Sequence, residues 1–225
     1  MLIPRFYFAG EFSAFDSYLR SQPHVEKIFR KGEYLWKPGH PYDCVQYYVQ
    51  GATVFFASHE SGRRKIISFH GPGTMLPGYH TNEFKIELAL VVEALCNVRV
   101  LEFGIAQFGR MFAANSTLAL AVVNHYATCM NRMLFETIHQ DFNTSRVKLC
   151  NLLYLLTMNQ PANTGLVIKM TQEDIADILG MSRVQITREL TWLRGQGILA
   201  TKRGRLTVCD LPALAGLCTD ESRVG

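Results

Sequence analysis

The chain has 225 residues, of which 48% are hydrophobic and 19% charged, and its formal net charge at pH 7 is +4. At roughly 150 residues per domain this length favours two modest domains, and the apolar share excludes an intrinsically disordered chain. No apolar run reaches the ~20 residues of a membrane helix, and the N-terminus lacks a signal-peptide pattern. We therefore expect a cytoplasmic protein that makes no membrane contact.

The six cysteines are scattered along the chain, and no two of them form a Cys-x-x-Cys pair. Structural zinc and iron–sulfur sites usually need closely spaced ligands, so the sequence predicts no metal site. In a chain without a signal peptide, such cysteines are expected to be reduced core residues. A redox role for one of them is the alternative.

The first half of the chain alternates short runs of β-branched and aromatic residues with glycines. Strands are predicted at 45–49, 52–56, 65–69, 86–92 and 98–103. Short strands separated by Gly turns at such intervals are typical of a compact all-β barrel or roll.

Residues 105–142 contain no proline and a single glycine, which predicts a long helix. Apolar side chains recur along it with the 4, 3 spacing of a heptad repeat, which favours a helix that pairs with a second copy of itself. The alternative is a helix buried on both faces within one monomer. The predicted dimer seam consists of Val123, Tyr126, Met130 and Met133.

Two short amphipathic helices are predicted between residues 171 and 194. Thr171 to Asp174 and Ser182 to Gln185 both have the pattern of a capping box, in which a side chain at each end satisfies a free backbone N–H. Gly180 lies between the two helices and provides the left-handed conformation that a tight turn needs. This pattern indicates a helix-turn-helix, whose second helix can enter the DNA major groove.

Two further strands, 198–201 and 206–209, flank a basic glycine turn and predict a wing. Residues 181–206 carry six basic side chains and one acidic side chain, a local excess that suits a phosphate-binding surface. A winged helix that serves only protein contacts is the alternative. The predicted DNA contacts are Thr171, Ser182, Arg183, Val184, Gln185, Thr187, Arg188, Lys202, Arg203 and Arg205.

The segment 180–188, with the sequence GMSRVQITR, resembles the G-x-S-R-E-T-V-x-R signature of the Crp/Fnr family, the cyclic-AMP receptor protein and fumarate–nitrate regulator family. The glycine-marked segments 31–35, 38–39, 48–51 and 71–73 are similar to those of the family's β roll. The resemblance implies an α+β fold and a homodimeric transcription regulator, not an enzyme, whose partners are promoter DNA and RNA polymerase. The implied domains are a β roll (1–108, a cupin-like jelly roll), a dimerisation helix (109–142) and a winged helix-turn-helix (143–225).

The positions at which this sequence departs from the family pattern restrict the classes of effector and cofactor that we expect. The stretch 75–79 lacks the acid that binds the ribose of a cyclic nucleotide, and Leu88-Ala89 stands where the family has Arg-Ser. Residues 1–43 contain no cysteine, which excludes the family's iron–sulfur branch. His80 is one residue out of step with the ligand of the haem-containing branch, and Pro4 is not terminal. We expect no cofactor, with a haem-based gas or redox sensor as the alternative.

A small-molecule effector of another kind remains. Val184 stands where the family has Glu. Over a few residues this segment resembles the branch of the family that regulates reductive dehalogenation, which also has Val there and senses chlorinated phenolic acids. An aromatic acid could lie against aromatic walls, with a cation meeting its carboxylate. The predicted effector-binding residues are Tyr79, His80, Lys85, Tyr126 and Met130. The alternative is that the tyrosines and the methionine belong to an interface core.

Overall fold

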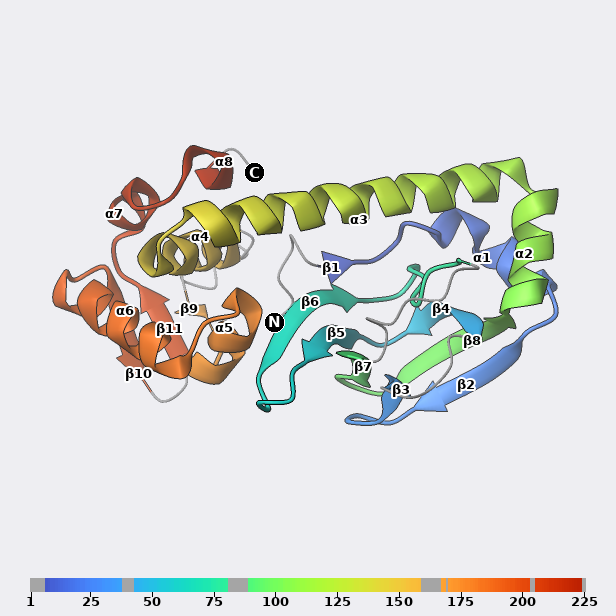
Figure 1. Cartoon of the computed structure of the whole chain (residues 1–225), viewed down its shortest axis with the longest axis horizontal. Coiled ribbons are helices and arrows are strands. Elements are labelled where there is room, and N and C mark those ends of the chain that lie inside the picture. Colours follow the sequence, from blue (N-terminus) through green and yellow to red (C-terminus); the bar gives the residue numbers. More distant parts are fainter. Residues whose placement is uncertain are drawn as a thin grey trace. The chain divides into compact units, whose positions relative to one another are not determined.

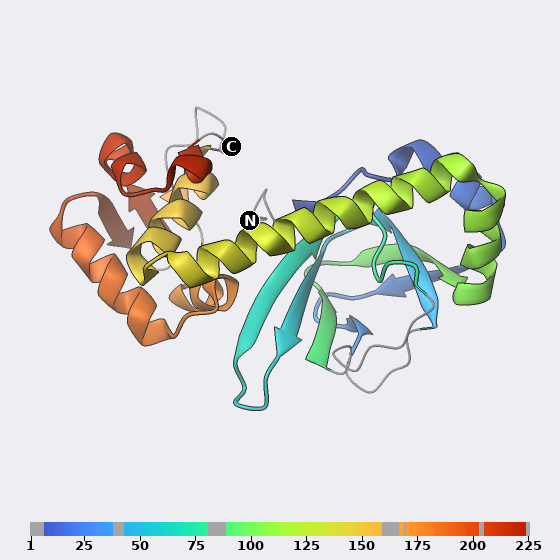
Figure 2. The ribbon, with the colours of Figure 1, turned by 45° about the horizontal axis from the view of Figure 1, so that its top comes forward.

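The computed structural model describes residues 7–37, 43–80, 89–158, 167–168, 170–202 and 205–223. The chain packs as two compact units, Phe6–Arg132 and Met133–Gly225. Helix α3 (Ser116–Phe142) runs from the first unit into the second (Figures 1 and 2).

The first unit is a roll of two sheets. The five-stranded sheet has the order β1-β6-β5-β7-β3 and the three-stranded sheet has the order β2-β8-β4. All pairs are antiparallel except β1 with β6. The strands are β1 (Tyr7–Phe8), β2 (Val25–Phe29), β3 (Tyr34–Trp36), β4 (Cys44–Gln50), β5 (Thr53–Ser58), β6 (Arg64–His70), β7 (Leu90–Ala94) and β8 (Val98–Gly104).

The sheet β2-β8-β4 has apolar side chains on both faces, because it lies between the inside of the roll and a helical cover. Strand side chains alternate between the two faces. Tyr48 and Val100 therefore belong to the core inside the roll. Val45 and Leu101 belong to a second core, which includes residues of α1 (Asp16–Ser21), α2 (Ile105–Ala114) and α3.

The predicted strands recur in the structure with shifted ends. Those at 45–49, 52–56, 65–69 and 98–103 correspond to β4, β5, β6 and β8. The strand predicted at 86–92 is found at Leu90–Ala94, and residues 81–88 lie outside the described part of the chain.

The helical region after the roll is divided in two, where the sequence predicts one helix over 105–142. Helix α2 ends at Ala114, and Asn115 has extended backbone angles. The side-chain Oδ1 of Asn115 then accepts the backbone N–H of Leu118 at 3.0 Å, as an N-cap residue does. The predicted dimerisation helix of 109–142 therefore starts later, at Ser116, because Asn115-Ser116 favours a cap over continuation.

The second unit contains the end of α3 and a small three-stranded sheet of order β10-β11-β9. Its core combines Leu149 and Leu153 of α4 with Ile186 and Leu190 of α6, all buried. The elements are α4 (Ser145–Met158), β9 (Val167–Ile168), α5 (Gln172–Leu179), α6 (Arg183–Gly195), β10 (Leu199–Lys202), β11 (Arg205–Val208), α7 (Leu211–Gly216) and α8 (Asp220–Arg223).

All six cysteines are free thiols, but they are not all core residues. Cys150 and Cys218 are buried, whereas Cys96 and Cys209 are exposed, so the expectation of a core position is wrong for the last two. Burial raises the pKa of Cys150 to about 12, which keeps this thiol protonated and unreactive at neutral pH. Within the described residues, no helix combines the length and the apolar character needed to cross a membrane.

Candidate nucleic-acid interface

Both predicted capping boxes are present and fix the two helices of the helix-turn-helix. Thr171 Oγ1 accepts the N–H of Asp174 at 3.0 Å, and the Asp174 carboxylate accepts the N–H of Thr171 at 2.8 Å. Helix α5 ends at Gly180, whose φ of 64° is left-handed. A residue with a side chain is strained in that conformation, so Gly180 fixes the turn into α6.

Ser182 and Gln185 form the second box at the start of α6. Gln185 Oε1 accepts the N–H of Ser182 at 2.9 Å and its hydroxyl at 3.0 Å, while Ser182 Oγ accepts the N–H of Gln185 at 3.2 Å. A bidentate contact of Gln185 with adenine needs that amide oxygen as an acceptor. The cap therefore has to open before Gln185 can make the predicted base contact.

Four predicted side chains are exposed on the first turns of α6, and one of them, Thr187, is bonded to α5. Arg183 is exposed, Val184 is 79% exposed, and the side chain of Arg188 is 68% exposed. Val184 lies between the exposed Arg183 and Arg188 in the first turns of the helix, where a bound partner would cover its side chain. Arg183, Val184 and Arg188 form what we call the reading face.

Thr187 and Arg194 are committed to contacts inside the unit. Thr187 Oγ1 donates to Gln172 Oε1 at 2.8 Å and so ties α6 to α5. Arg194 donates to Thr191 Oγ1 at 2.8 Å and to Thr201 Oγ1 of β10 at 3.2 Å. Arg194, one of the six basic side chains of residues 181–206, thus supports the wing strand β10.

The sequence analysis missed an ion cluster beneath the reading face. Glu189 is buried, and its carboxylate accepts Arg188 at 3.0 Å and Arg146 of α4 at 2.9 Å. The guanidinium carbon of Arg146 lies 3.7 Å from the centroid of the Trp192 ring, which adds a cation–π contact. The sequence signal that could have revealed this cluster was Glu189, a charged residue within the apolar stripe formed by Ile186 and Leu190.

The wing is the hairpin of β10 and β11. Lys202 and Arg205 are paired in its register, so two exposed cations stand side by side next to the turn. Arg203 lies outside the described residues. Exposed Lys and Arg side chains next to a turn suit phosphates, which carry no sequence information.

Comparison with known proteins shows which regulators this chain resembles. Residues 147–217 match the family model of the Crp-like helix-turn-helix domain. The chain is a Crp/Fnr-type DNA-binding transcription regulator. It is 27% identical over 196 residues to the global nitrogen regulator of Synechococcus elongatus, covering 83% of this chain and 86% of that protein. It is also 24% identical over 199 residues to the nitrogen fixation regulation protein FixK of Rhizobium meliloti, covering 88% and 89%.

Solved structures agree with the fold of this Crp/Fnr-type regulator. CprK in its complex with OCPA has a TM-score of 0.70 at 19% identity and covers 91% of this chain and 93% of its own. FixK2 from Bradyrhizobium japonicum has a TM-score of 0.67 at 20% identity, with coverage of 88% and 98%. The predicted α+β fold of roll, long helix and winged helix-turn-helix is confirmed, and the matched relatives are regulators, not enzymes.

The predicted effector residues of the regulator are brought together only in part. The Tyr126 hydroxyl of α3 donates to the backbone oxygen of Tyr79 at 2.6 Å. The Tyr79 ring packs against Phe108 and Phe112 of α2, with centroids 5.3 and 5.4 Å away. Met130 is exposed, His80 is half-buried, and Lys85 lies outside the described residues. The Tyr79 side chain thus has a core position.

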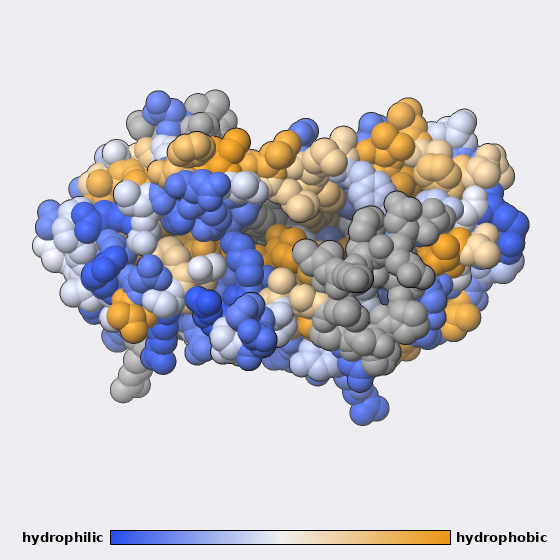
Figure 3. Space-filling view, in the orientation of Figure 1, coloured by the Kyte–Doolittle hydropathy of each residue, from blue (hydrophilic) through white to orange (hydrophobic). Residues whose placement is uncertain are grey.

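The predicted dimer seam is exposed along α3. Val123, Tyr126, Met130 and Met133 are all exposed, Met133 at 65%. Figure 3 shows apolar surface along this helix. The exposed stripe also includes residues that the predicted seam does not contain: Leu120, Leu134, Ile138 and Phe142.

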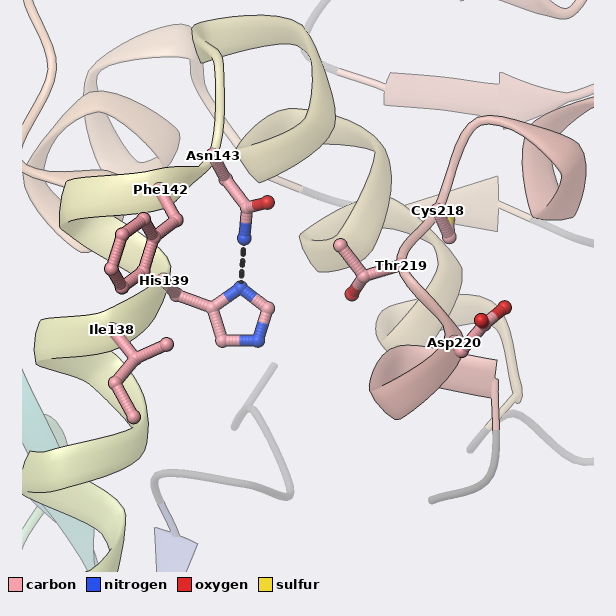
Figure 4. A pocket seen from close by; sticks show the side chains of 7 residues that line it. All are labelled: Ile138, His139, Phe142, Asn143, Cys218, Thr219 and Asp220. Atoms are coloured by element: carbon pink, nitrogen blue, oxygen red, sulfur yellow. Dashed lines mark hydrogen bonds between the residues drawn. The ribbon is translucent and has the colours of Figure 1, made fainter.

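A cavity of about 500 Å³ lies in the second unit, between the end of α3 and the segment that leads into α8. Figure 4 shows His139 pointing into it, with the side-chain amide of Asn143 donating to His139 Nδ1. None of the predicted effector residues lines this cavity. The lining residues are Ile138, His139, Phe142, Asn143, Cys218, Thr219 and Asp220.

Proposed function

We propose that this chain is a homodimeric transcription regulator that binds an inverted-repeat operator and responds to a small-molecule effector that is not a cyclic nucleotide. The observation that carries the proposal is the reading face, where Arg183, Val184 and Arg188 are exposed on one capped helix. Arg188 also balances the buried Glu189 carboxylate, but a purely structural helical hairpin would not need Arg183 and Val184 exposed beside it.

The reading face suits base recognition in the major groove. An arginine can donate two hydrogen bonds to O6 and N7 of guanine, and a valine can contact the methyl group of thymine. The wing cations Lys202 and Arg205 would meet the phosphates beside the groove and set the register. Base contacts by α6 and phosphate contacts by the wing together give a specific complex.

The exposed apolar stripe of α3 supports dimerisation. Burying Val123, Met130 and Met133 against the same residues of a second copy would remove apolar surface from water at about 25 cal/mol per Å². Dimeric helix-turn-helix proteins bind two half-sites about one helical turn of DNA apart, which is why we propose an inverted repeat. The proposed partners are promoter DNA, a second copy of the chain and RNA polymerase.

The loop after β6 supports an effector other than a cyclic nucleotide. The stretch 75–79 contains no acid to bind a ribose. A Cβ atom at Gly78 would lie 2.5 Å from the Tyr126 hydroxyl, so this loop is closely packed against α3. CprK, a structural neighbour, was solved with OCPA bound, which supports a small-molecule effector for a protein of this fold. We propose an aromatic acid.

Salt-dependent DNA binding tests the proposal. The protein is titrated onto a site selected from a random DNA library and onto a fragment of equal length in which that site is scrambled, from 50 to 300 mM salt. We expect tighter binding to the selected site, and the logarithm of the affinity should fall linearly with the logarithm of the salt concentration as counterions are released. Equal, salt-independent affinities would support a winged helix that contacts only proteins. Sedimentation of the free protein reports its dimer state in parallel.

A further inference from the structure

The last turns of α3 expose a row of large apolar side chains in the second unit. Leu134, Ile138 and Phe142 follow one another at intervals of four residues, which makes them neighbours along one side of the helix. They are 57%, 53% and 81% exposed. Ile138 and Phe142 also line the cavity of about 500 Å³ (Figure 4). An exposed apolar patch beside a cavity suits contact with another apolar segment.

This row turns away from the predicted dimer seam. With 3.6 residues per turn, Phe142 lies about 120° around the helix from Met130. Tyr126 and Met133 lie within about 60° of Met130, on its other side. A second copy that packs along the seam therefore has Phe142 and the cavity on its flank, not between the two helices.

The start of the described chain runs beside α3 in the opposite direction. The Phe12 ring meets the His125 ring with centroids 5.4 Å apart. Four residues earlier in the chain, Phe8 also meets His125, and it reaches Arg132, whose guanidinium carbon lies 4.3 Å from the Phe8 centroid. Four residues span at most about 14 Å, and the seven residues from His125 to Arg132 span about 10 Å of helix. The chain and the helix thus advance at a similar pace.

Another step of the same length leads from Phe8 to Pro4 and from Arg132 to His139. Figure 4 shows His139 pointing into the cavity. Residues 1–6, which we call the N-terminal segment, lie outside the described residues and have the sequence MLIPRF. Five of these six side chains are apolar, so the segment has the composition that the exposed row requires.

We propose that the N-terminal segment of the same chain docks on this face, with Leu2 and Ile3 packed against Ile138 and Phe142 at the mouth of the cavity. Because β1 holds the segment beside α3, docking is intramolecular and needs only a small apolar contact. Burial of one such side chain favours the docked state about tenfold or more. The docked segment connects the roll to the DNA-binding unit a second time, in addition to α3.

Trypsin cleavage after Arg5 tests the contact, because a protease cuts the open form of a segment. The full-length protein is digested under native conditions, and mass spectrometry follows the loss of residues 1–5. We expect Ile3→Asp and Phe142→Ser each to speed this cleavage about tenfold or more, because each removes one side of the apolar contact. The double variant should be cleaved no faster than the faster single variant. Phe142→Leu keeps an apolar side chain and should be cleaved at about the parent rate.

Two controls separate docking from other effects. Peptides of residues 1–10, with and without Ile3→Asp, correct for the sequence preference of trypsin. Leu120→Ser removes an exposed apolar side chain of α3 far from the cavity and should leave the cleavage rate unchanged. Equal rates in the parent, Ile3→Asp and Phe142→Ser would overturn the proposal, as would a rate that only Ile3→Asp increases.

Mixed dimers distinguish the chain's own segment from that of a second copy. Phe142→Ser chains labelled with ¹⁵N are refolded together with an excess of unlabelled parent, and the labelled and unlabelled products are separated by mass. We expect the labelled chains to be cleaved as fast as before mixing, since each segment docks on its own helix. Protection of the labelled chains by the parent would show that the segment docks on the second copy and would overturn the proposal.

Discussion

Glu189 holds Arg188 by one edge of its guanidinium group. Oε1 of Glu189 accepts Nε of Arg188 at 3.1 Å and Nη2 at 3.0 Å, while Oε2 is occupied by Nε of Arg146 at 2.9 Å. A guanidinium group has five N–H donors in a fixed plane. With the Nε edge tied to Glu189, the outer edge formed by Nη1 and Nη2 is still able to donate in pairs. Glu189 therefore orients the arginine that we expect to read a base.

Glu189→Gln tests this orientation. The amide keeps the shape and removes the charge that two arginines share. We expect unfolding to become easier by about 1–2 kcal/mol, because both arginines are partly exposed and can return to water. We also expect the ratio of operator to non-specific affinity to fall by up to about tenfold, as Arg188 loses its fixed geometry. Chemical denaturation and gel-shift titrations measure the two effects. Asp141→Asn, at an exposed acid of the same unit, should change neither.

Substitutions in the reading face and in the wing should change DNA affinity in different ways. Arg188→Ala should cost about 1–3 kcal/mol on the operator and little on non-specific DNA, because it removes a base contact. Lys202→Ala or Arg205→Ala should weaken binding to all sequences alike and lower the salt slope by about one. Arg110→Ala is the control, because it removes an exposed arginine of the first unit that bonds Gln107 on its own helix. Operator affinity unchanged in Arg188→Ala would show that α6 does not read the site.

Local signals were sufficient for the helix-turn-helix. The caps at Thr171 and Ser182 and the left-handed Gly180 depend on residues within a few positions of each other, and all three occur as predicted. The break between α2 and α3 at Asn115 also depends on local residues. It was not predicted because the apolar repeat over 105–142 continues across it, and one asparagine within such a repeat does not indicate a helix end.

The contacts that the sequence did not predict join distant segments. Glu189 meets Arg146 across 43 residues, and Phe8 of β1 meets His70 of β6 and His125 of α3. In each case a polar residue lies in an apolar pattern, where periodicity only predicts burial. Its partner depends on how helices and strands pack, which no local pattern specifies.

Dimer formation is tested by placing a charge in the stripe. Met130 is exposed in the monomer, and in the proposed dimer Met130→Asp would bury an unpaired carboxylate. We expect monomers in sedimentation, at least about a hundredfold weaker association, and loss of operator binding. Asn131→Asp adds the same charge at an exposed polar position and should leave the dimer intact. A dimer that survives Met130→Asp would show that this stripe is not the seam.

The buried His70 should make the roll less stable in mild acid. Its pKa is lowered from 6.5 to about 3 by burial, so below pH 6.5 the unfolded chain binds a proton that the folded roll does not. The free energy of unfolding should therefore fall as the pH decreases from 6.5 toward 3, by up to about 1.4 kcal/mol per pH unit.

Urea unfolding at pH 7.5, 6 and 5 measures the slope. Trp36 lies in the roll, and Trp192→Phe removes the tryptophan of the other unit, so fluorescence then reports on the roll alone. His70→Phe should flatten the pH dependence, whereas His59→Asn in the exposed β5–β6 turn should not. An equal slope in His70→Phe would mean that other groups cause the acid sensitivity.

We expect the base preference at the centre of the reading face to depend on Val184. Its side chain is exposed and has no group that can accept a hydrogen bond, so it cannot bind the N4 amino group of cytosine as a glutamate would. Its two methyl groups fit the methyl group of thymine. Gln185 does not provide an alternative while its amide oxygen closes the cap with Ser182. Each half-site should therefore carry A·T where a glutamate would require G·C.

Val184→Glu should move that preference at one base pair per half-site toward G·C, by about 1–3 kcal/mol. Selection from a random DNA library, run in parallel on the parent and the variant, reads out the preference at every position. Val184→Ala is the control, since it removes most of the thymine contact without adding an acceptor, and it should relax the position without favouring G·C. A parent protein that already selects G·C there, or a glutamate variant whose preference does not move, would show that Val184 does not face the bases.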